Sequence, residues 1–268
     1  MPSTNPTPEL AVKDNSGRRN AFGDVYARVK RWDEGEFGVL SARDEADLAA
    51  IVRKAKVFFP PSSRVLEIGF GNGGFLAYGR KRQWEMHGTE MNEILLKRAR
   101  RNGFAVTQAD NFNSLPKGYF DLVAAFDVLE HVPSCGIPDF LRDVRRVLKE
   151  GAVFIARFPN GDSPFGRFNQ HGDPTHVTTI GKHKAKYFAE QAGFEALYIG
   201  GEPQPLWSDL PHLAYRLLAL PLRGILNLAL NFLFCAGDPK SLCSINLVMV
   251  LRLAETEPRS PANTGASE

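Results

Sequence analysis

A short apolar run in residues 64–76 (RVLEIGFGNGGFL) contains one carboxylate and leads directly into a cluster of glycines. These glycines are Gly69, Gly71, Gly73 and Gly74. The run predicts a buried strand, and the glycines would let the backbone turn tightly and approach a ligand closely. A helix is predicted to follow, and its first N–H groups have no partners within the helix, so they can bind a ligand. Glu67 adds a negative charge at the strand end, which suits a ligand that carries positive charge.

The glycine spacing alone leaves the ligand open. Gly69, Gly71 and Gly74 satisfy the pattern G-x-G-x-x-G, which also occurs in dinucleotide-binding turns. The next predicted strand ends at Glu90, an acidic residue about 20 positions after the glycines, where ribose hydroxyls are commonly bound. NAD and S-adenosylmethionine both contain that ribose, but the carboxylate of Glu67 favours the positively charged S-adenosylmethionine.

Two later segments resemble motifs of a known family. Residues 118–133 (GYFDLVAAFDVLEHVP) resemble the fourth-strand motif of class I S-adenosylmethionine-dependent methyltransferases, and residues 147–159 (VLKEGAVFIARFP) resemble their fifth strand. The family usually has leucine-lysine-proline-glycine-glycine before that strand, whereas this chain has LKEGA. The resemblance extends over residues 64–194, and it is to methyltransferases of types 11 and 23, which act on sugars, polysaccharide precursors or small metabolites. It implies S-adenosyl-L-methionine as the cofactor.

The resemblance also implies a set of cofactor-binding residues. Asp110 is expected to take the adenine amino group, with Asn111 and Phe112 flanking the ring. The full set is Glu67, Gly69, Gly71, Gly73, Glu90, Met91, Asp110, Asn111, Phe126 and Asp127.

Histidines follow the fourth and fifth predicted strands, and they are candidates for catalysis. Methyl transfer is an in-line displacement, so an enzyme mainly aligns donor and acceptor, and an oxygen or nitrogen acceptor also benefits from a general base. Ligands of open α/β sheets bind at the carboxyl ends of the strands. We therefore predict His131 and His176 as candidate bases, with Asp173 in the same loop, HGDPTHVTTIGKH. That loop resembles the one found in methyltransferases of sugars and related small metabolites.

His131 has two other interpretations. It lies in a leucine-glutamate-histidine-valine motif that methyltransferases of different substrates share, so its ring can simply hydrogen-bond within the fold. Asp127, Glu130 and His131 also offer oxygen and imidazole ligands for Mg²⁺ or Zn²⁺, and quinone-pathway O-methyltransferases use a comparable motif for metal. We expect no metal, because such close spacing along the chain does not establish that the three side chains converge.

Predicted strands and helices alternate, which is typical of a parallel sheet with right-handed crossovers. We expect an α/β, Rossmann-like, doubly wound sheet of seven strands, mostly parallel, with an antiparallel last strand. The fifth strand is predicted over residues 151–158, and the last two over residues 194–199 and 245–253. A helical insertion over residues 204–240 is expected between those last two strands.

The remaining segments divide the chain into four parts. The predicted order is a disordered leader (1–20), an N-terminal helical cap (21–61), the methyltransferase domain (62–254) and a disordered tail (255–268). Within the cap, residues 44–59 have an amphipathic pattern with acidic residues early and basic residues late, which favours a helix. Trp32 and Phe37 are expected either to line a cap over the cofactor pocket or to pack the helix against the sheet.

The connection between the last two strands is much longer than the hairpin normally found there. Its residues 213–234 (LAYRLLALPLRGILNLALNFLF) contain only two charged residues. At about 100° per residue, Arg216, Arg223, Asn227 and Asn231 fall within an arc of about 80°, and most of the remaining surface is apolar. We expect one helix, or two helices kinked at the central proline.

Three environments suit this helix. Its apolar face can pack on the protein's own sheet or on a second copy, lie at a membrane surface, or span the bilayer. Spanning fits least, because the following strand must return to the sheet. Residues 211–236 are therefore the expected site of a homodimer contact or a peripheral membrane contact.

Composition restricts the partners and the location. A net charge of +3 is too small to require nucleic acid, and we expect no nucleic-acid partner. Cys135, Cys235 and Cys243 have neither metal-ligand spacing nor a disulfide framework, which favours a reducing compartment. Residues 1–20 contain no apolar run that could act as a signal peptide. We expect a cytoplasmic protein, with peripheral contact at the inner face of the membrane as an extension of that prediction.

These observations predict a methyltransferase that uses S-adenosyl-L-methionine and acts on a small-molecule or glycan acceptor. The expected reaction is O-methylation of a hydroxyl on a sugar, a polysaccharide precursor or a small metabolite. One alternative is a lipophilic acceptor, such as a quinone precursor or a lipid-linked glycan at the membrane surface. An NAD-dependent oxidoreductase leaves Glu67 and the later motifs unexplained, and the intact cofactor motif argues against a non-catalytic scaffold of the same fold.

Overall fold

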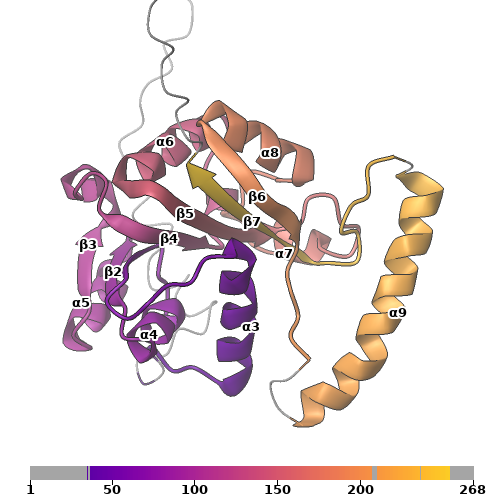
Figure 1. Cartoon of the computed structure of the whole chain (residues 1–268), viewed down its shortest axis with the longest axis horizontal. Coiled ribbons are helices and arrows are strands. Elements are labelled where there is room, and N and C mark those ends of the chain that lie inside the picture. The colour runs from indigo at the N-terminus through magenta and orange to yellow at the C-terminus, as the bar shows by residue number, and fades with distance from the viewer. Residues whose placement is uncertain (1–34, 36, 207–209, 236, 254–268) are drawn as a thin grey trace, which may run out of the picture.

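A single sheet runs through the centre of the molecule, with helices on both of its faces (Figure 1). The computed structural model describes residues 35, 37–206, 210–235 and 237–253. The predicted leader, the predicted tail and Trp32 lie outside the described residues, so the interpretations of these segments stay predictions.

The sheet has seven strands in the order β3-β2-β1-β4-β5-β7-β6. The strands are β1 (Arg64–Ile68), β2 (Glu85–Glu90), β3 (Ala105–Gln108), β4 (Phe120–Phe126), β5 (Leu148–Pro159), β6 (Phe194–Gly201) and β7 (Asn246–Leu253). β7 pairs antiparallel with β5 and β6, whereas the other neighbouring strands are parallel. This arrangement confirms the predicted seven-stranded, Rossmann-like sheet with an antiparallel last strand.

Helices cover both faces of the sheet. Those described are α3 (Ala42–Val52), α4 (Gly74–Lys81), α5 (Glu93–Arg101), α6 (Ile137–Val147), α7 (Arg167–His171), α8 (Lys182–Gln191) and α9 (Leu210–Phe234). α6 and α8 pack on one face, and α3 and α4 pack on the other. α5 packs with α4 around a smaller apolar cluster near β2 and β3.

Successive residues of the central strands point to opposite faces, and both faces are apolar. In β4, Leu122 and Ala124 pack with the α3 and α4 side, whereas Val123 and Ala125 pack with the α6 and α8 side. All four side chains are fully buried. Burial on both faces explains why this strand is a continuous apolar run in the sequence.

Two predicted boundaries are wrong by several residues. The helix predicted over residues 44–59 ends at Val52, because a 3-10 turn follows and leads to Lys56, which has a left-handed conformation with φ 55°. A left-handed residue terminates a helix. β5 begins at Leu148 rather than Gly151, and its pairing with β4 is irregular in this first part.

Phe37 is buried, and it packs within the domain core instead of lining a cap over the cavity. Its ring meets the rings of Phe70 and Phe104 edge-on, with centroids 6.2 and 6.3 Å away. Val39 and Leu40, a few residues later, line the large cavity described below.

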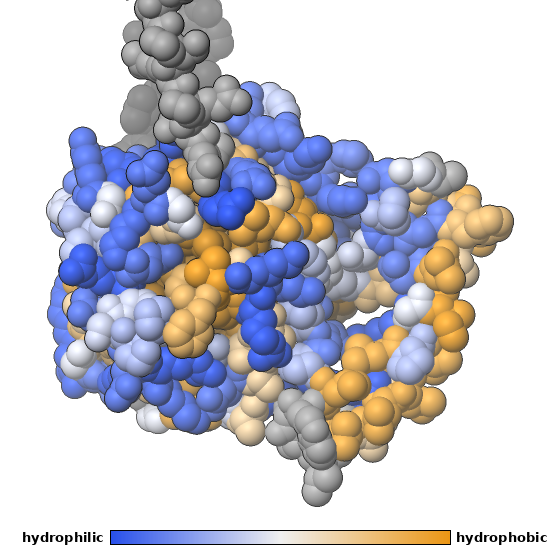
Figure 2. Space-filling model, viewed as in Figure 1, coloured by the Kyte–Doolittle hydropathy of each residue, from blue (hydrophilic) through white to orange (hydrophobic). Residues whose placement is uncertain are grey.

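α9 is the predicted helical insertion between β6 and β7, and it is one continuous helix through its central proline. Figures 1 and 2 show it standing away from the sheet, with an apolar outer surface. Packing of that apolar face on the protein's own sheet, one of the predicted environments, is wrong, because Leu218, Ile225 and Phe232 are 69%, 67% and 82% exposed. The helix turns its polar residues toward the rest of the chain, as in the hydrogen bond from the Cys243 N–H to Asn227 Oδ1.

The turn between β1 and α4 leads to a prediction about stability. Gly73 has φ +75°, and a Cβ added to it would lie 2.6 Å from the Phe37 ring. We expect Gly73→Ala to lower the free energy of unfolding by about 1–3 kcal/mol, because the side chain would strain the backbone and overlap the ring. Urea unfolding followed by circular dichroism measures the change.

Gly74→Ala is the matched control, because nothing lies within 4 Å of a Cβ added there. We expect it to be neutral or slightly stabilising, since alanine restricts the unfolded chain more than glycine does. Equal stabilities of the two variants would show that the turn does not require glycine at position 73.

Candidate functional site

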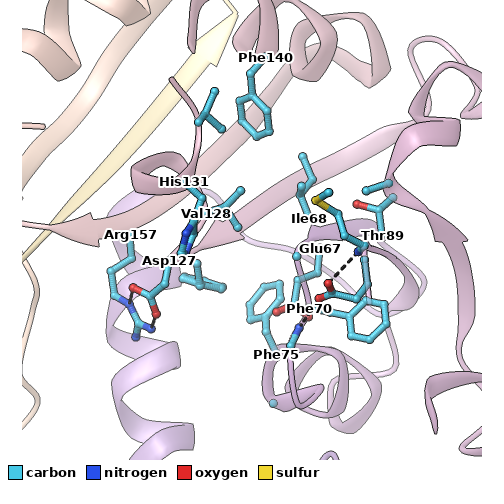
Figure 3. A pocket seen from close by; sticks show the side chains of 18 of the residues that line it. Glu67, Ile68, Phe70, Phe75, Thr89, Asp127, Val128, His131, Phe140 and Arg157 are labelled. Carbon is cyan, nitrogen blue, oxygen red and sulfur yellow. Dashed lines mark hydrogen bonds and ion pairs between the residues drawn. The ribbon is translucent and has the colours of Figure 1, made fainter. Parts of the chain in front are cut away.

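A cavity of about 980 Å³ opens where the carboxyl ends of β1, β2, β4 and β5 meet. Open α/β sheets bind their ligands in crevices of this kind. In Figure 3, Glu67 and Thr89 lie on one side of the cavity, and Asp127, His131 and Arg157 lie on the other. α3 borders the same space, so the cavity is enclosed partly by the segment before β1.

The glycine turn after β1 forms part of the cavity wall. Gly69 and Gly71 have φ +67° and +51°, which is the left-handed region that favours glycine. A Cβ on Gly69 would lie 2.7 Å from Val128 Cγ2, so the loop after β4 leaves no room for a side chain there. The turn therefore brings bare backbone to the cavity, as its sequence predicts.

Glu67 is a buried carboxyl group that also lines the cavity. It is 4% exposed, and its Oε2 atom has no hydrogen-bond partner among the described residues. Burial raises the pKa of Glu67 well above its ordinary value, opposed in part by a hydrogen bond from the Leu76 backbone, while the nearby Glu90 raises it further. A cationic ligand group would supply both a hydrogen bond and a countercharge to this carboxylate.

Glu90 joins the glycine turn to the end of β2. Its Oε2 accepts a hydrogen bond from the Gly71 N–H at 3.1 Å, and its Oε1 accepts from the N–H groups of Met91 and Asn92 at 2.7 and 3.1 Å. Burial raises the pKa of Glu90, and the three backbone hydrogen bonds act in the opposite direction. The carboxylate thus holds the turn in place at the point where we expect the ribose.

Asp127 lines the cavity as an ion-pair partner of β5. Its carboxylate pairs with Arg157, which also contacts Glu202 at 3.3 Å. The two acids raise the pKa of the Arg157 guanidinium, although burial opposes them. Asp127 itself has φ +57°, an uncommon conformation for a residue with a side chain.

Seven of the ten predicted cofactor residues line the cavity, and Gly73, Asp110 and Asn111 do not. Asp110 and Asn111 are exposed in the 3-10 turn after β3, whereas their neighbours Ala109 and Phe112 do line it. The adenine contact of Asp110 therefore stays a prediction.

His131 is the predicted catalytic residue whose side chain lines the cavity. Its Nδ1 atom lies 3.2 Å from the Thr175 carbonyl oxygen and 3.0 Å from Thr175 Oγ1. Because a carbonyl oxygen only accepts, Nδ1 carries the proton of the neutral ring and Nε2 carries the lone pair. Thr175 Oγ1 in turn donates to Asp173 Oδ1 at 2.5 Å, so Asp173 orients His131 through Thr175.

His176 lies behind His131 and does not line the cavity. The two rings meet edge-on with centroids 4.7 Å apart, and the His176 side chain is 6% exposed. Its Nε2 atom lies 3.8 Å from Glu130 Oε1 and 3.7 Å from Asp173 Oδ2. The structure thus brings the three predicted catalytic residues together, with His131 in front.

The predicted combination of Asp127, Glu130 and His131 does not form a metal site, because Asp127 pairs with Arg157 instead. Glu130, His131 and His176 are the residues whose ligand atoms lie within 4.8 Å of one another. Two imidazoles and a carboxylate could bind a divalent metal, and the same group could relay a proton.

Several cavity residues were not predicted from the sequence. Arg157 is the clearest case, because a charged residue inside an otherwise apolar strand is a signal that a partner is needed. Its partner Glu202 comes from the end of β6, and Asp47 and Asp143 come from α3 and α6. Those acidic residues have no distinguishing local pattern, because the fold alone brings them to the cavity.

Comparison with known proteins identifies the domain. Residues 41–199, more than half of the chain, match a family model described as a methyltransferase domain. A search of curated proteins found no significant match.

Solved structures share the fold at low sequence identity. A SAM-dependent methyltransferase from Archaeoglobus fulgidus is 19% identical with a TM-score of 0.58, and the match covers 85% of this chain and 98% of that one. A Haloferax volcanii methyltransferase, solved with its activator Trm112, is 13% identical with a TM-score of 0.59, covering 90% and 99%. Phosphoethanolamine N-methyltransferase 2 of Haemonchus contortus, solved with S-adenosyl-L-methionine, is 14% identical with a TM-score of 0.57, covering 91% and 61%.

The family match includes the glycine turn and the strands that form the cavity. The chain therefore belongs to the methyltransferase domain family, as an S-adenosyl-L-methionine-dependent methyltransferase.

Proposed function

We propose that the protein transfers a methyl group from S-adenosyl-L-methionine to a hydroxyl of a small acceptor, such as a sugar, a polysaccharide precursor or a related metabolite. The observation that carries this proposal is the cluster of His131, His176, Glu130 and Asp173 at the cavity. A hydroxyl acceptor must lose a proton on methylation, and a positioned histidine can take it.

The residues on the donor side fit S-adenosyl-L-methionine. Glu67 offers a buried carboxylate oxygen with no partner among the described residues, and the glycine turn offers backbone at the cavity wall. When bound, the cofactor supplies a methyl group on a positively charged sulfonium. Glu67 would neutralise positive charge on this ligand, and Glu90 would hold the ribose while keeping the turn in shape.

On the acceptor side, His131 is the proposed general base. The acceptor oxygen forms a bond to the methyl carbon as the carbon–sulfur bond breaks, and the hydroxyl proton passes to His131 Nε2. Thr175 fixes the tautomer that leaves a lone pair on that atom, and Asp173 fixes Thr175. His176 and Glu130 lie behind the ring and can stabilise its positive charge after the transfer.

A lipophilic acceptor is the second candidate, and the lining of the cavity favours it. Val128, Val132, Pro133 and Phe140 form an apolar part of the wall next to His131. A quinone precursor or the lipid end of a lipid-linked glycan would find apolar contacts there. The same base would serve either acceptor.

A labelling experiment tests the proposed function. The protein is incubated with methyl-labelled S-adenosyl-L-methionine and with aqueous or organic fractions of a cell extract. We expect label in a product that withstands mild alkali, because methyl ethers are stable there and carboxyl methyl esters are not. Label that is released by alkali, or that is found on nitrogen, would contradict transfer to a hydroxyl.

Replacing the proposed base should slow the reaction without affecting the donor. We expect His131→Ala to lower kcat about 10²–10⁴-fold on the active fraction, with unchanged binding of S-adenosyl-L-methionine by calorimetry. His87→Ala is the matched control, because His87 also bonds a threonine (Thr107 Oγ1 at 3.0 Å) but lies outside the cavity lining. Equal losses in the two variants would argue against the base.

Glu67→Gln separates donor binding from stability. We expect about 10–100-fold weaker binding of S-adenosyl-L-methionine by calorimetry, because the substitution removes a charged hydrogen-bond acceptor. Binding to the wild type should tighten as pH rises, since the cationic donor favours the ionised carboxylate. Buffers of different ionisation enthalpy should reveal proton release on binding to the wild type that the variant lacks.

The same substitution should raise the stability of the ligand-free protein at high pH. The folded-state pKa of Glu67 lies above its ordinary value of 4.5, so the folded protein loses stability as pH rises from there through the raised pKa. Glu67→Gln does not titrate, so its free energy of unfolding should exceed that of the wild type above this range. The difference should shrink below pH 4.5, and a difference that is constant with pH would contradict the assignment.

A chelator distinguishes the proton relay from a metal site. We expect dialysis against EDTA to leave the transfer rate unchanged, because the proposed step needs only the side chains. Loss of activity that Mg²⁺ or Zn²⁺ restores would instead assign Glu130, His131 and His176 as metal ligands.

A further inference from the structure

α9 has its polar side turned toward the protein and its apolar side turned toward solvent. Its polar seam consists of Arg216, Arg223, Asn227 and Asn231. Asn227 Oδ1 accepts from the Cys243 N–H at 3.1 Å, and Asn231 both accepts from the Lys240 N–H and donates to its carbonyl oxygen. The segment that leads into β7 thus runs along the polar seam.

The two charged residues of the seam are also engaged by the protein. Arg216 is 4% exposed, donates to the Pro205 carbonyl oxygen and pairs with Asp47 of α3 at 3.0 Å. Arg223 donates to the Tyr215 hydroxyl at 2.9 Å and to the side chain of Gln204. No charge of this helix is therefore left for its outer side.

The outer side of α9 is apolar along its whole length. Every exposed residue from Leu217 to Phe234 is either apolar or glycine. An outer stripe, opposite the seam, is formed by Leu218, Ile225, Leu228 and Phe232, which are 69%, 67%, 72% and 82% exposed. A soluble monomer rarely leaves a continuous apolar surface of this kind uncovered, and Figure 2 shows it as the orange flank of the molecule.

The composition of this surface matches lipid better than protein. Protein interfaces combine an apolar centre with a polar rim and with hydrogen bonds across the contact. The outer side of α9 offers no side-chain donor or acceptor between Leu217 and Phe234. By length and hydropathy the segment Leu213–Phe234 resembles a helix immersed in a bilayer, with a mean hydropathy of 1.7.

We propose that α9 docks the protein on the surface of a phospholipid bilayer, lying along the membrane with its outer stripe among the acyl chains and its polar seam toward the domain. Both ends of the helix return to β6 and β7, which pair with each other in one sheet. Spanning the bilayer would pull Asn227, Asn231 and Arg216 away from their partners, so the helix lies on one side of the membrane.

This docking brings the cavity close to the lipid. The Arg216–Asp47 pair joins α9 to α3, and Asp47 lines the cavity, as do Leu48 and Ile51 on the same helix. An acceptor carried by a lipid could then reach the cavity along α3. The docking itself does not depend on which acceptor is methylated.

Flotation with vesicles tests the proposal on the full-length chain. We expect the protein to float with phosphatidylcholine vesicles, and about equally well with vesicles of phosphatidylcholine and phosphatidylglycerol in equal parts. Because no cation lies on the outer stripe, the bound fraction should change little up to about 0.5 M NaCl. Absence of flotation, or binding only to the anionic vesicles at low salt, would overturn the proposal.

A pair of double variants locates the contact. Ile225→Glu with Phe232→Glu should lower the lipid-bound fraction about tenfold or more, because two charges would enter the acyl region. Phe58→Glu with Tyr187→Glu is the matched control, since Phe58 and Tyr187 are 82% and 55% exposed on other parts of the surface. Equal loss in both would show that added negative charge, rather than α9, is responsible.

Two further measurements keep the result decisive. Calorimetry with S-adenosyl-L-methionine should give the same affinity for both double variants and the wild type, which shows that the domain is folded. Ile225→Ser with Phe232→Ser replaces the first variant if its affinity differs. Sedimentation velocity should show a monomer, and a dimer that the Ile225→Glu and Phe232→Glu variant abolishes would assign the outer stripe to a second copy of the chain.

Discussion

A carboxyl group kept away from water at the end of β1 is the constraint on which the donor side of the molecule depends. Glu67 lies on a strand flanked by β2 and β4 and covered on both faces, and burial raises its pKa. Ionised and without a countercharge, this group destabilises the empty fold. The same energy becomes available when a cationic ligand arrives, so the protein is tuned for its ligand at the expense of its own stability.

The strand order decides which groups can meet that ligand. β1 and β4 are neighbours in the sheet, so the glycine turn after β1 faces the loop that carries His131 after β4. The loop after β5 completes this side through Thr175, and Arg157 ties β5 to the acids that follow β4 and β6. Donor binding and proton removal are therefore arranged on opposite sides of one crevice, each held by contacts that do not involve the other.

Much of the sheet could be predicted from the sequence, because its strands are short apolar runs separated by clear turn and cap signals such as Asn92 at the start of α5. The cofactor side was predictable too, since Glu67 and its glycines are contiguous. The order of His131 in front of His176 was not, because it depends on where a loop from β5 folds against one from β4. The outward orientation of α9 was equally hidden: periodicity defines a polar seam, but only distant residues such as Cys243 decide which way it faces.

The position of α9 within the chain has an evolutionary consequence. It is inserted between two strands that already pair with each other, so its removal would leave an ordinary hairpin and an unchanged strand order. A single insertion or deletion at this site could therefore add or remove the helix without disturbing the residues that handle the methyl group. Relatives with the same catalytic domain can thus differ in where they work in the cell while retaining the same chemistry.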